Sequence, residues 1–493
     1  MKKTLKVVFI VLMLGVMLCL CACSSATIKA LNKSYEDANT IIKDGLIRVG
    51  AISKDGNMRY GFLDKRGKVK IPLTYMYASE FSEGLAVVST DGIKFGFINK
   101  KQKSVIPENY TEAYPFVDGY AIVKNNEGKY GVINKKQTYL LGFTYDSIQY
   151  VPQKKCFICS QTGVDGNKKF GIIDIKGNKV LDLLYKSVVI DEDYVIIQDF
   201  NSTYGLKKYS DKNFSIEFGK YVYLDYTEGR VVAAVKNENN ETKYGLLKLN
   251  GKVLHEFDFS SAFSFGNEGF AVAFKTLTGA NKSAKNYTYL INKNGKEIAS
   301  SYSNDIDAFI DVTPSGYTIF RFNGRYGLLK SSNGKIVLDP IYDDIDLFMD
   351  DENFTLNING QVYLTNAKGD KLLKETFDGI SFVSGNRYAV IKTGRYAFVD
   401  KRCNKKCEYL YDRIYPCYKN TGMYKVRIEN KYGFINKNGK VKISVKYDYL
   451  GSCFIDGVTV AGKKTDNVMQ YGVLKQNGKA LTEFKYDLIG NVD

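Results

Sequence analysis

A short motif, in which an aromatic residue is followed by glycine, recurs along the whole chain and limits the possible folds more than any other feature. Its fullest copy is the segment 431–448, which reads KYGFINKNGKVKISVKYD. Nine copies keep both residues and begin at Tyr60, Phe95, Tyr130, Phe170, Tyr204, Tyr244, Tyr326, Tyr432 and Tyr471. Three weaker copies, at Tyr289, Tyr363 and Tyr396, lack the glycine, so twelve units start 33 to 45 residues apart. A fixed period in this range predicts a solenoid, a propeller or another tandem array.

Each unit contains three apolar runs that are separated by tight turns. In the clearest copy, Asn438-Gly439 joins the motif strand to the next run. Asn-Gly between two alternating runs is the strongest local hairpin signal, because both turn residues need a positive φ. The sequence therefore predicts an all-β fold, a tandem array of about twelve three-stranded antiparallel meanders. Propellers hold roughly four to eight blades, so either two propeller-like rings or an open β-superhelix fits this number.

The array is predicted to span residues 46–493. Its first strand begins at Leu46 and its last run lies near 484–486, which predicts an array of whole units. The pattern is weaker at 183–228 and at 298–323. These segments are either divergent units or the junction of two sub-arrays, which would then meet between about 183 and 323.

The N-terminus has the features of a targeting segment. Three lysines precede the apolar run 7–20, which is too short for a comfortable membrane span. The run ends in Leu20-Cys21-Ala22-Cys23, which resembles the lipobox of a bacterial lipoprotein signal peptide. The resemblance implies removal of residues 1–22, acylation of Cys23 by chains such as palmitate, and a polar tether over 23–45. A plain signal peptide and an uncleaved anchor are the alternatives. Acylation would anchor the protein to a membrane in the cell envelope, outside the cytoplasm.

The repeat unit resembles the bacterial WG-repeat family. The shared features are aromatic-Gly-Phe-Ile followed by Asp or Asn, a basic turn that ends in Gly-Lys, and a later Phe-x-Glu/Asp-Gly. The resemblance covers 46–493, and Tyr or Phe replaces the family's Trp in every unit. It implies an all-β interaction module in envelope or secreted proteins, and it carries over no catalytic residue and no cofactor.

Charge and location limit the possible partners. The chain has 70 Lys and Arg against 53 Asp and Glu, a formal net charge of +17, and its basic residues are spread along the sequence. An exported protein without a basic stripe is a poor candidate for binding nucleic acid. We therefore expect a membrane-anchored binding or scaffold module for a protein, a glycan or an anionic wall polymer. An envelope hydrolase with carboxylates in a central cleft and a structural spacer without a ligand are the alternatives.

Few side chains are candidates for catalysis or for binding a metal ion. His255, the only histidine, is expected to be solvated or locally bonded. An aspartate follows the last tyrosine of several units and is expected to accept backbone N–H groups in a turn; these residues are Asp146, Asp343, Asp412, Asp448 and Asp487. The acidic segment 343–352 lacks the spacing of a calcium loop. We predict no catalytic residue, no metal site and no cofactor.

Two disulfides are possible among the cysteines. Cys156 and Cys159 lie three apart in a strand, on opposite faces, and so cannot pair. Cys403 and Cys407 flank a hairpin turn that has lost its glycine, and a disulfide there is plausible in an exported protein. Cys417 and Cys453 each follow a tyrosine by six residues, where other units have phenylalanine. They are interpreted as small core residues or, less strongly, as a disulfide between units.

The lipidation of Cys23 is directly testable. We expect mass spectrometry of the mature N-terminus to find a chain that begins at a diacylglyceryl-modified Cys23. An unmodified chain that begins at Met1 would contradict the predicted location.

Overall fold

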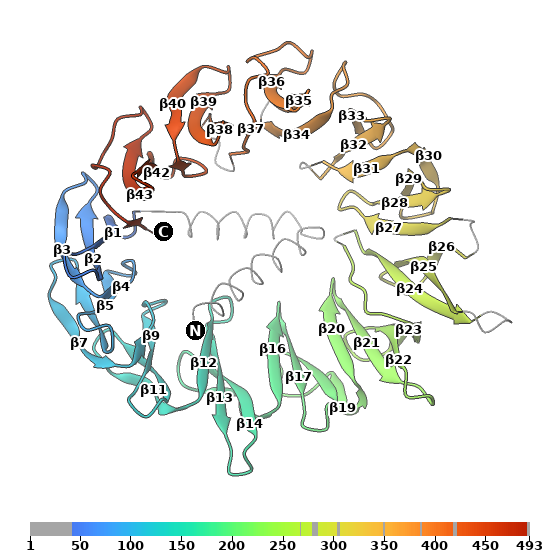
Figure 1. Cartoon of the computed structure of the whole chain (residues 1–493). Helices are drawn as coiled ribbons and strands as arrows, with labels where there is room; N and C mark the ends of the chain where they lie inside the picture. The colour runs from blue at the N-terminus through green and yellow to red at the C-terminus, as the bar shows by residue number, and fades with distance from the viewer. Residues whose placement is uncertain are drawn as a thin grey trace. The chain divides into compact units, whose positions relative to one another are not determined.

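The computed structural model describes residues 42–266, 268–278, 284–302, 306–348, 351–384, 387–417 and 422–490. The proposed signal peptide and Cys23 lie outside these residues. The described chain forms two compact units, which are coloured along the sequence in Figure 1. The first unit comprises residues 42–188, 395–398 and 406–490, and the second comprises residues 189–394 and 399–405, with the gaps given above.

The first unit contains the strands at both ends of the described chain. They are β1 (Leu46–Ile52), β2 (Met58–Asp64), β3 (Val69–Tyr75), β4 (Tyr77–Ala78), β5 (Leu85–Ser89), β6 (Phe95–Asn99), β7 (Ser104–Tyr110), β8 (Glu112–Ala113), β9 (Tyr120–Lys124), β10 (Tyr130–Asn134), β11 (Tyr139–Tyr145), β12 (Ser147–Val151), β13 (Cys156–Thr162), β14 (Lys168–Asp174), β15 (Lys179–Tyr185), β37 (Arg413–Ile414), β38 (Met423–Ile428), β39 (Lys431–Asn436), β40 (Val441–Tyr447), β41 (Tyr449–Leu450), β42 (Val458–Thr465), β43 (Val468–Lys475) and β44 (Leu488–Ile489).

The second unit contains the strands between them. They are β16 (Ser187–Asp191), β17 (Tyr194–Gln198), β18 (Tyr204–Lys208), β19 (Ile216–Tyr221), β20 (Tyr223–Thr227), β21 (Arg230–Lys236), β22 (Thr242–Leu247), β23 (Val253–Phe259), β24 (Phe270–Thr278), β25 (Ala284–Asn292), β26 (Glu297–Ser300), β27 (Ala308–Val312), β28 (Tyr317–Phe322), β29 (Arg325–Lys330), β30 (Ile336–Tyr342), β31 (Asp344–Leu347), β32 (Asn353–Ile358), β33 (Gln361–Asn366), β34 (Gly379–Ser384), β35 (Arg387–Lys392) and β36 (Arg395–Val399). A boundary between the units crosses the first strand named here, and the last strand named here lies in the first unit except for its final residue.

These strands form twelve small antiparallel sheets of the kind that make propeller blades, which confirms the all-β prediction. Eight sheets have four strands rather than the predicted three. In seven of them the added strand is the segment that returns from the preceding unit, for example β12, which pairs with β13. The prediction of three strands per unit did not include this segment. The weakly matching segments form regular strands as well, including β16–β19 and β27–β28.

The glycine of the motif lies where the strand that follows the motif strand comes closest to it. The β39–β40 pairing shifts register between Tyr432↔Tyr447 and Phe434↔Ile443, so that a bulge in β40 lies opposite Gly433. A Cβ atom on Gly433 would lie 2.6 Å from the carbonyl oxygen of Ile443. The same conflict with a third-strand carbonyl oxygen recurs at Gly61, Gly96, Gly131, Gly171, Gly245 and Gly327. Close backbone approach therefore explains why glycine recurs at this position.

We expect Gly433→Ala to lower the free energy of unfolding by about 1–3 kcal/mol, because the new methyl group must displace a backbone carbonyl. Gly142→Ala is the matched control, since Gly142 also lies in a strand but has no atom within 4 Å of the added Cβ. Urea unfolding of both variants measures the difference. Equal unfolding midpoints for the two variants would show that the close approach does not restrict this position.

Hydrophobic cores lie between consecutive sheets in each unit. In the first unit, Leu85 and Val87 of β5 pack against Ala121 and Val123 of β9. The largest fully buried side chains include the aromatic residues two positions after the motif aromatic, namely Phe62, Phe97 and Phe434. Most motif aromatics are themselves half-buried at the edge of these cores, so they are not splayed into solvent.

The aspartate that follows the last tyrosine of a unit connects consecutive sheets. Asp448 Oδ1 pairs with Lys431 Nζ of β39 at 2.5 Å, and Asp448 Oδ2 accepts a hydrogen bond from the N–H of Lys464 in β42 at 3.0 Å. The same backbone contact to the next sheet is made by Asp146, Asp343, Asp412 and Asp487. The prediction that these aspartates accept backbone N–H groups is confirmed, and the donor belongs to the following sheet rather than to the aspartate's own turn. We call this contact the aspartate clamp.

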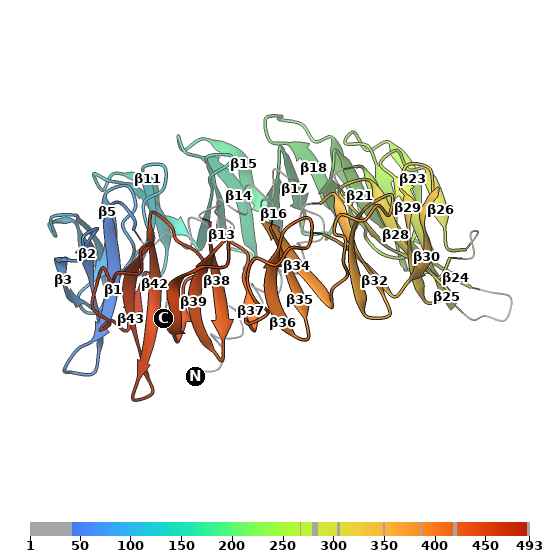
Figure 2. The same cartoon turned by 90° about the horizontal axis from the view of Figure 1, so that it is seen from above.

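The end of the described chain completes the first sheet, which corrects the prediction of whole units. Residues 488–489 form β44, which pairs with β1 through Val49↔Ile489 and Gly50↔Leu488. Asp487 accepts the N–H of Ile52, and Arg48 donates to the carbonyl oxygen of Gly490. Figure 2 shows that the β1–β2 and β42–β43 hairpins of this unit project to the same side.

The aspartate clamp predicts an acid-sensitive contribution to stability. The Lys431 ammonium lowers the pKa of Asp448, so this contribution is complete above about pH 5 and is lost as the pH falls through the lowered folded-state pKa. We expect Asp448→Ala to cost about 1 kcal/mol at pH 7, because the pair is partly exposed. Asp448→Asn keeps an acceptor for the Lys464 N–H and should cost less. Urea midpoints at pH 7 and pH 3 measure the effect, and a D448A deficit that is as large at pH 3 as at pH 7 would contradict it.

Candidate functional site

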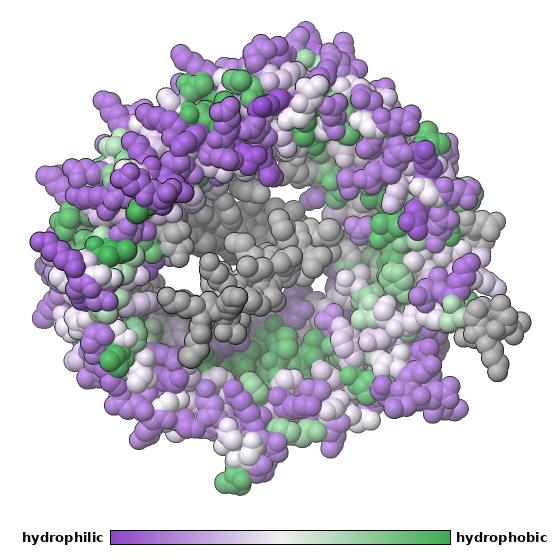
Figure 3. All heavy atoms as spheres, in the orientation of Figure 1, coloured by the Kyte–Doolittle hydropathy of each residue, from purple (hydrophilic) through white to green (hydrophobic). Residues whose placement is uncertain are grey.

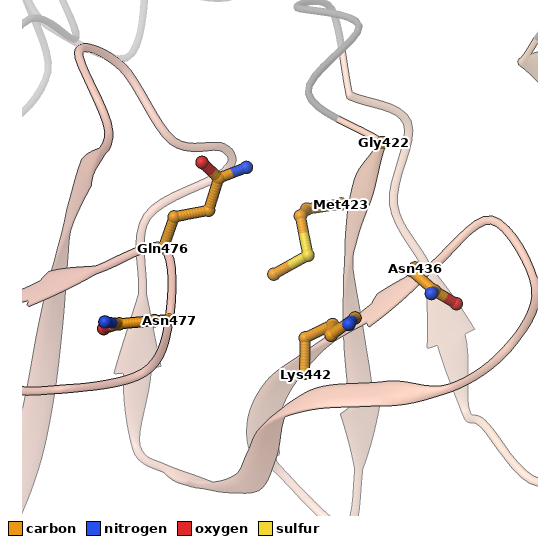
Figure 4. A pocket seen from close by; sticks show the side chains of 6 residues that line it. All are labelled: Gly422, Met423, Asn436, Lys442, Gln476 and Asn477. Atoms are coloured by element: carbon orange, nitrogen blue, oxygen red, sulfur yellow. The ribbon is translucent and has the colours of Figure 1, made fainter.

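A groove in the first unit is the best candidate for a binding site. Its volume is about 610 Å³, and it is lined by Gly422, Met423, Asn436, Lys442, Gln476 and Asn477. Figure 4 shows that these residues come from β38, the β39–β40 turn region and the turn after β43, so the groove lies between two consecutive sheets. The side chain of Met423 extends into the space toward Gln476.

The polar side chains that extend into the groove are those of Gln476 and Lys442, whereas the side chains of Asn436 and Asn477 point away from Met423 (Figure 4). Asn436 Oδ1 accepts the N–H groups of Asn438 and Lys440, and Asn477 Oδ1 accepts the N–H of Lys479. Their carboxamide oxygens are therefore held in the turns, which leaves the NH₂ groups as the free polar ends. Lys442 is exposed and adds an ammonium group, whereas Met423 is buried and supplies an apolar base.

His255 belongs to a second polar cluster, in the second unit. Its Nδ1 lies 2.9 Å from the carbonyl oxygen of Gly295, and its Nε2 lies 3.2 Å from Asp258 Oδ1. Lys275 Nζ joins Asp258 and Glu297 at 2.8 and 2.5 Å. The hydrogen bond to Asp258 raises the pKa of His255, because both ring nitrogens face acceptors and the doubly protonated ring satisfies both. His255 is thus locally bonded, as expected.

The sulfur atoms of the hairpin cysteines accept backbone hydrogen bonds. Cys403 occupies the turn position where other units have glycine, and it adopts a φ of 65°. The N–H of Glu375 lies 3.4 Å from Cys403 Sγ, and the N–H of Phe398 lies 3.1 Å from Cys407 Sγ. The Cys403–Cys407 disulfide remains a prediction.

The position assigned to Cys453 needs a correction. Phe454, one residue later, packs on Phe434 with ring centroids 4.9 Å apart, as Phe81 packs on Phe62 and Phe116 on Phe97. The connection before Phe454 is therefore one residue longer than in those units, and Cys453 is not the counterpart of their phenylalanine. Cys453 is buried and Cys417 is half-buried, and a disulfide between them stays a prediction.

Other candidate features give no assembled site. Cys156 and Cys159 are both buried in β13, and burial raises the pKa of Cys159 to about 12. No group of three His, Cys, Asp or Glu side chains in the described ranges is arranged to hold a metal ion. Within the same ranges there is no helix with the length and hydropathy needed to cross a bilayer.

The fold defines the class of protein. It is an all-β tandem-repeat protein in which hydrophobic cores lie between sheets that are consecutive along the chain. The model of the WG containing repeat matches residues 60–92, 95–130, 244–275, 326–356 and 432–461. The chain therefore contains five segments that match the WG containing repeat, as the motif predicted. Such a repeated, propeller-like arrangement suggests a binding or scaffold module.

Similarity to individual proteins is weak. No curated protein matches the chain. A crystal structure of the eukaryotic initiation factor has a TM-score of 0.30 at 10% identity and covers 68% of this chain and 97% of its own. A crystal structure of the computationally designed Ika8 protein has a TM-score of 0.24 at 10% identity, with 59% and 92% covered. At this level neither structure bears on the function.

Proposed function

We propose that this protein is a lipid-anchored, extracytoplasmic binding module and that its ligand is a glycan or another oxygen-rich wall polymer. The donor-lined groove beside Met423 is the observation that carries the proposal. The segment Leu20–Cys23, which resembles a lipobox, supports the proposed anchoring and a location outside the cytoplasm, close to wall polymers.

The chemistry of the groove favours a sugar-like ligand. Carboxamide N–H groups and an ammonium group donate hydrogen bonds to the hydroxyl and ring oxygens that cover a glycan. The buried thioether of Met423 offers an adaptable apolar contact for the C–H face of a sugar ring. The groove is also open to solvent, so a long polymer can enter without having to present a free end.

The remaining surface fits a role near anionic material. Figure 3 shows a face covered mainly by hydrophilic residues, with hydrophobic residues in smaller groups. A formal charge of +17 favours contact with anionic lipid headgroups and wall polymers. Specific binding then depends on the groove, because dispersed charge attracts every polyanion to a similar degree.

Removal of one groove donor tests the proposed function. We expect Lys442→Gln to weaken binding of soluble peptidoglycan fragments or poly(glycerol phosphate) roughly tenfold, which corresponds to the loss of one charge-assisted hydrogen bond. Lys70→Gln is the matched control, because Lys70 is an exposed lysine at the equivalent place in β3, outside the groove. Isothermal titration of the purified full chain measures both affinities. Equal losses in the two variants, or none in K442Q, would contradict a role for the groove.

A further inference from the structure

One face of the β37–β40 sheet carries three cations and two tyrosines. Arg413 of β37 lies directly opposite Arg427 of β38, and Arg427 in turn lies opposite Tyr432 of β39. Lys425 precedes Arg427 by two residues, and Tyr415 follows Arg413 by two, so strand alternation places all five side chains on the same face. Sequence patterns do not reveal this cluster, because only the register of the strands brings its members together.

The cations pack on the tyrosine rings. Lys425 Nζ lies 4.7 Å from the ring centre of Tyr415 and 5.2 Å from that of Tyr432, and it donates a hydrogen bond to the carbonyl oxygen of Leu450 at 3.1 Å. The guanidinium carbon of Arg413 lies 5.1 Å from the ring centre of Tyr415. These rings hold the charged groups in place, but a ring quadrupole does not neutralise them.

No carboxylate in the described part of the chain forms an ion pair with Arg413, Lys425 or Arg427. Asp412 is their neighbour in sequence, but alternation turns it to the other face, where its carboxylate binds Arg395 and the N–H of Glu429. Like charges placed directly opposite each other destabilise a sheet. Burial lowers the pKa of Lys425 to about 8, and the charge of Arg413 acts in the same direction.

Two buried polar atoms at this interface also lack partners. Arg427 Nε is buried without a hydrogen-bond acceptor, and so is the hydroxyl of Thr459 in the facing sheet, a residue that is only 3% exposed. Thr459 lies on the same side of β42 as Ala461, which packs in one core with Met423 and Leu450. Buried polar groups normally have a partner, so the buried Arg427 Nε points to an acceptor that the described chain does not supply.

The first sheet shows how a basic residue behaves at the same position when its role is structural. Arg48 corresponds to Lys425, because the two lie opposite Phe62 and Phe434. The guanidinium of Arg48 donates to the carbonyl oxygens of Ala78 and Gly490, at 3.0 and 3.1 Å. The position of Arg427 is occupied there by Gly50, so the first sheet has no second cation two residues after Arg48.

We propose that Arg413, Lys425 and Arg427 form a subsite for a phosphate group of the polymer that occupies the neighbouring groove. Met423 and Arg427 are four residues apart on β38, about 13 Å, and they point to the same side, so one chain can contact both. The identity of the ligand as a polymer rests on the proposed function. The assignment of a phosphate group rests on the cluster itself.

Phosphate fits the cluster better than carboxylate does. The donors come from two neighbouring strands, with Arg413 on β37 and Lys425 and Arg427 on β38. A tetrahedral phosphate presents oxygens in several directions, whereas the two oxygens of a carboxylate lie in one plane. Guanidinium groups also match two phosphate oxygens at a time, and the adjacent ammonium adds a point charge.

Removal of the two arginines tests the subsite. We expect Arg413→Gln/Arg427→Gln in the full chain to weaken binding of poly(glycerol phosphate) at least tenfold, measured by isothermal titration in 150 mM salt. The matched control is Arg66→Gln/Arg402→Gln, which removes two exposed arginines from turns elsewhere and should change the affinity less than twofold. Thermal unfolding gives an independent readout, because poly(glycerol phosphate) should raise the Tm of the wild-type chain and of the control but not that of R413Q/R427Q.

Titrations with polygalacturonate and inorganic phosphate, and with the groove variant K442Q, distinguish the possible explanations of a change in affinity. Tighter binding of polygalacturonate than of poly(glycerol phosphate), with the same loss in R413Q/R427Q, would overturn phosphate in favour of carboxylate. Inorganic phosphate that binds while the polymer does not would overturn the polymer as its source. Unchanged polymer affinity in R413Q/R427Q combined with weaker binding in K442Q would overturn the subsite and leave the proposed function standing.

Discussion

The aspartate clamp is the contact on which the rest of the structure depends. A sheet of three or four short strands cannot bury both of its faces by itself, so its core exists only where the next sheet is held against it. Asp448 joins the side chain of Lys431 in one sheet to the backbone of Lys464 in the next, and therefore fixes how far each sheet lies from its neighbour. One of the two donors is a backbone N–H of the next sheet, so the side chain at that position of the next sheet can vary. The clamp thus constrains one residue in each unit that carries it, which helps these units to keep the same packing although they share little other similarity.

The aromatic-Gly motif imposes a second constraint, and its two residues differ in how strictly they are required. Gly433 lies against the carbonyl oxygen of Ile443, where no side chain fits. The aromatic residue before it is half-buried and lies opposite another aromatic residue, as in Tyr432↔Tyr447 and Tyr130↔Tyr145. A half-buried ring beside a second ring needs a flat apolar surface rather than one particular shape. This explains why tyrosine or phenylalanine can stand where the family has tryptophan.

The sequence predicted the parts of the fold that are encoded locally. Turn glycines, alternating runs and the motif period indicated the number of units and three of their strands. The fourth strand was missed because residues such as Ser147–Val151 become a strand only by pairing with the next unit. The pairing of β44 with β1 joins residues more than 430 positions apart, which no local pattern encodes. The misplaced counterpart of Phe81 has a similar cause, since a one-residue insertion before Phe454 is visible only from ring packing.

The candidate site arises where the sequence departs from its own repeat. At the position of Lys425, units other than the first have apolar residues such as Val87 and Ile122, which fill the core between sheets. A lysine there, with an arginine two residues later, weakens that core, and nothing in the described chain compensates the charge. Neither residue is unusual in a basic sequence with 70 Lys and Arg, so composition could not single them out. Their significance comes from Arg413, which the register of β37 and β38 places directly opposite Arg427. A repeat fold makes such departures informative, because the other units show which residue packing alone would select.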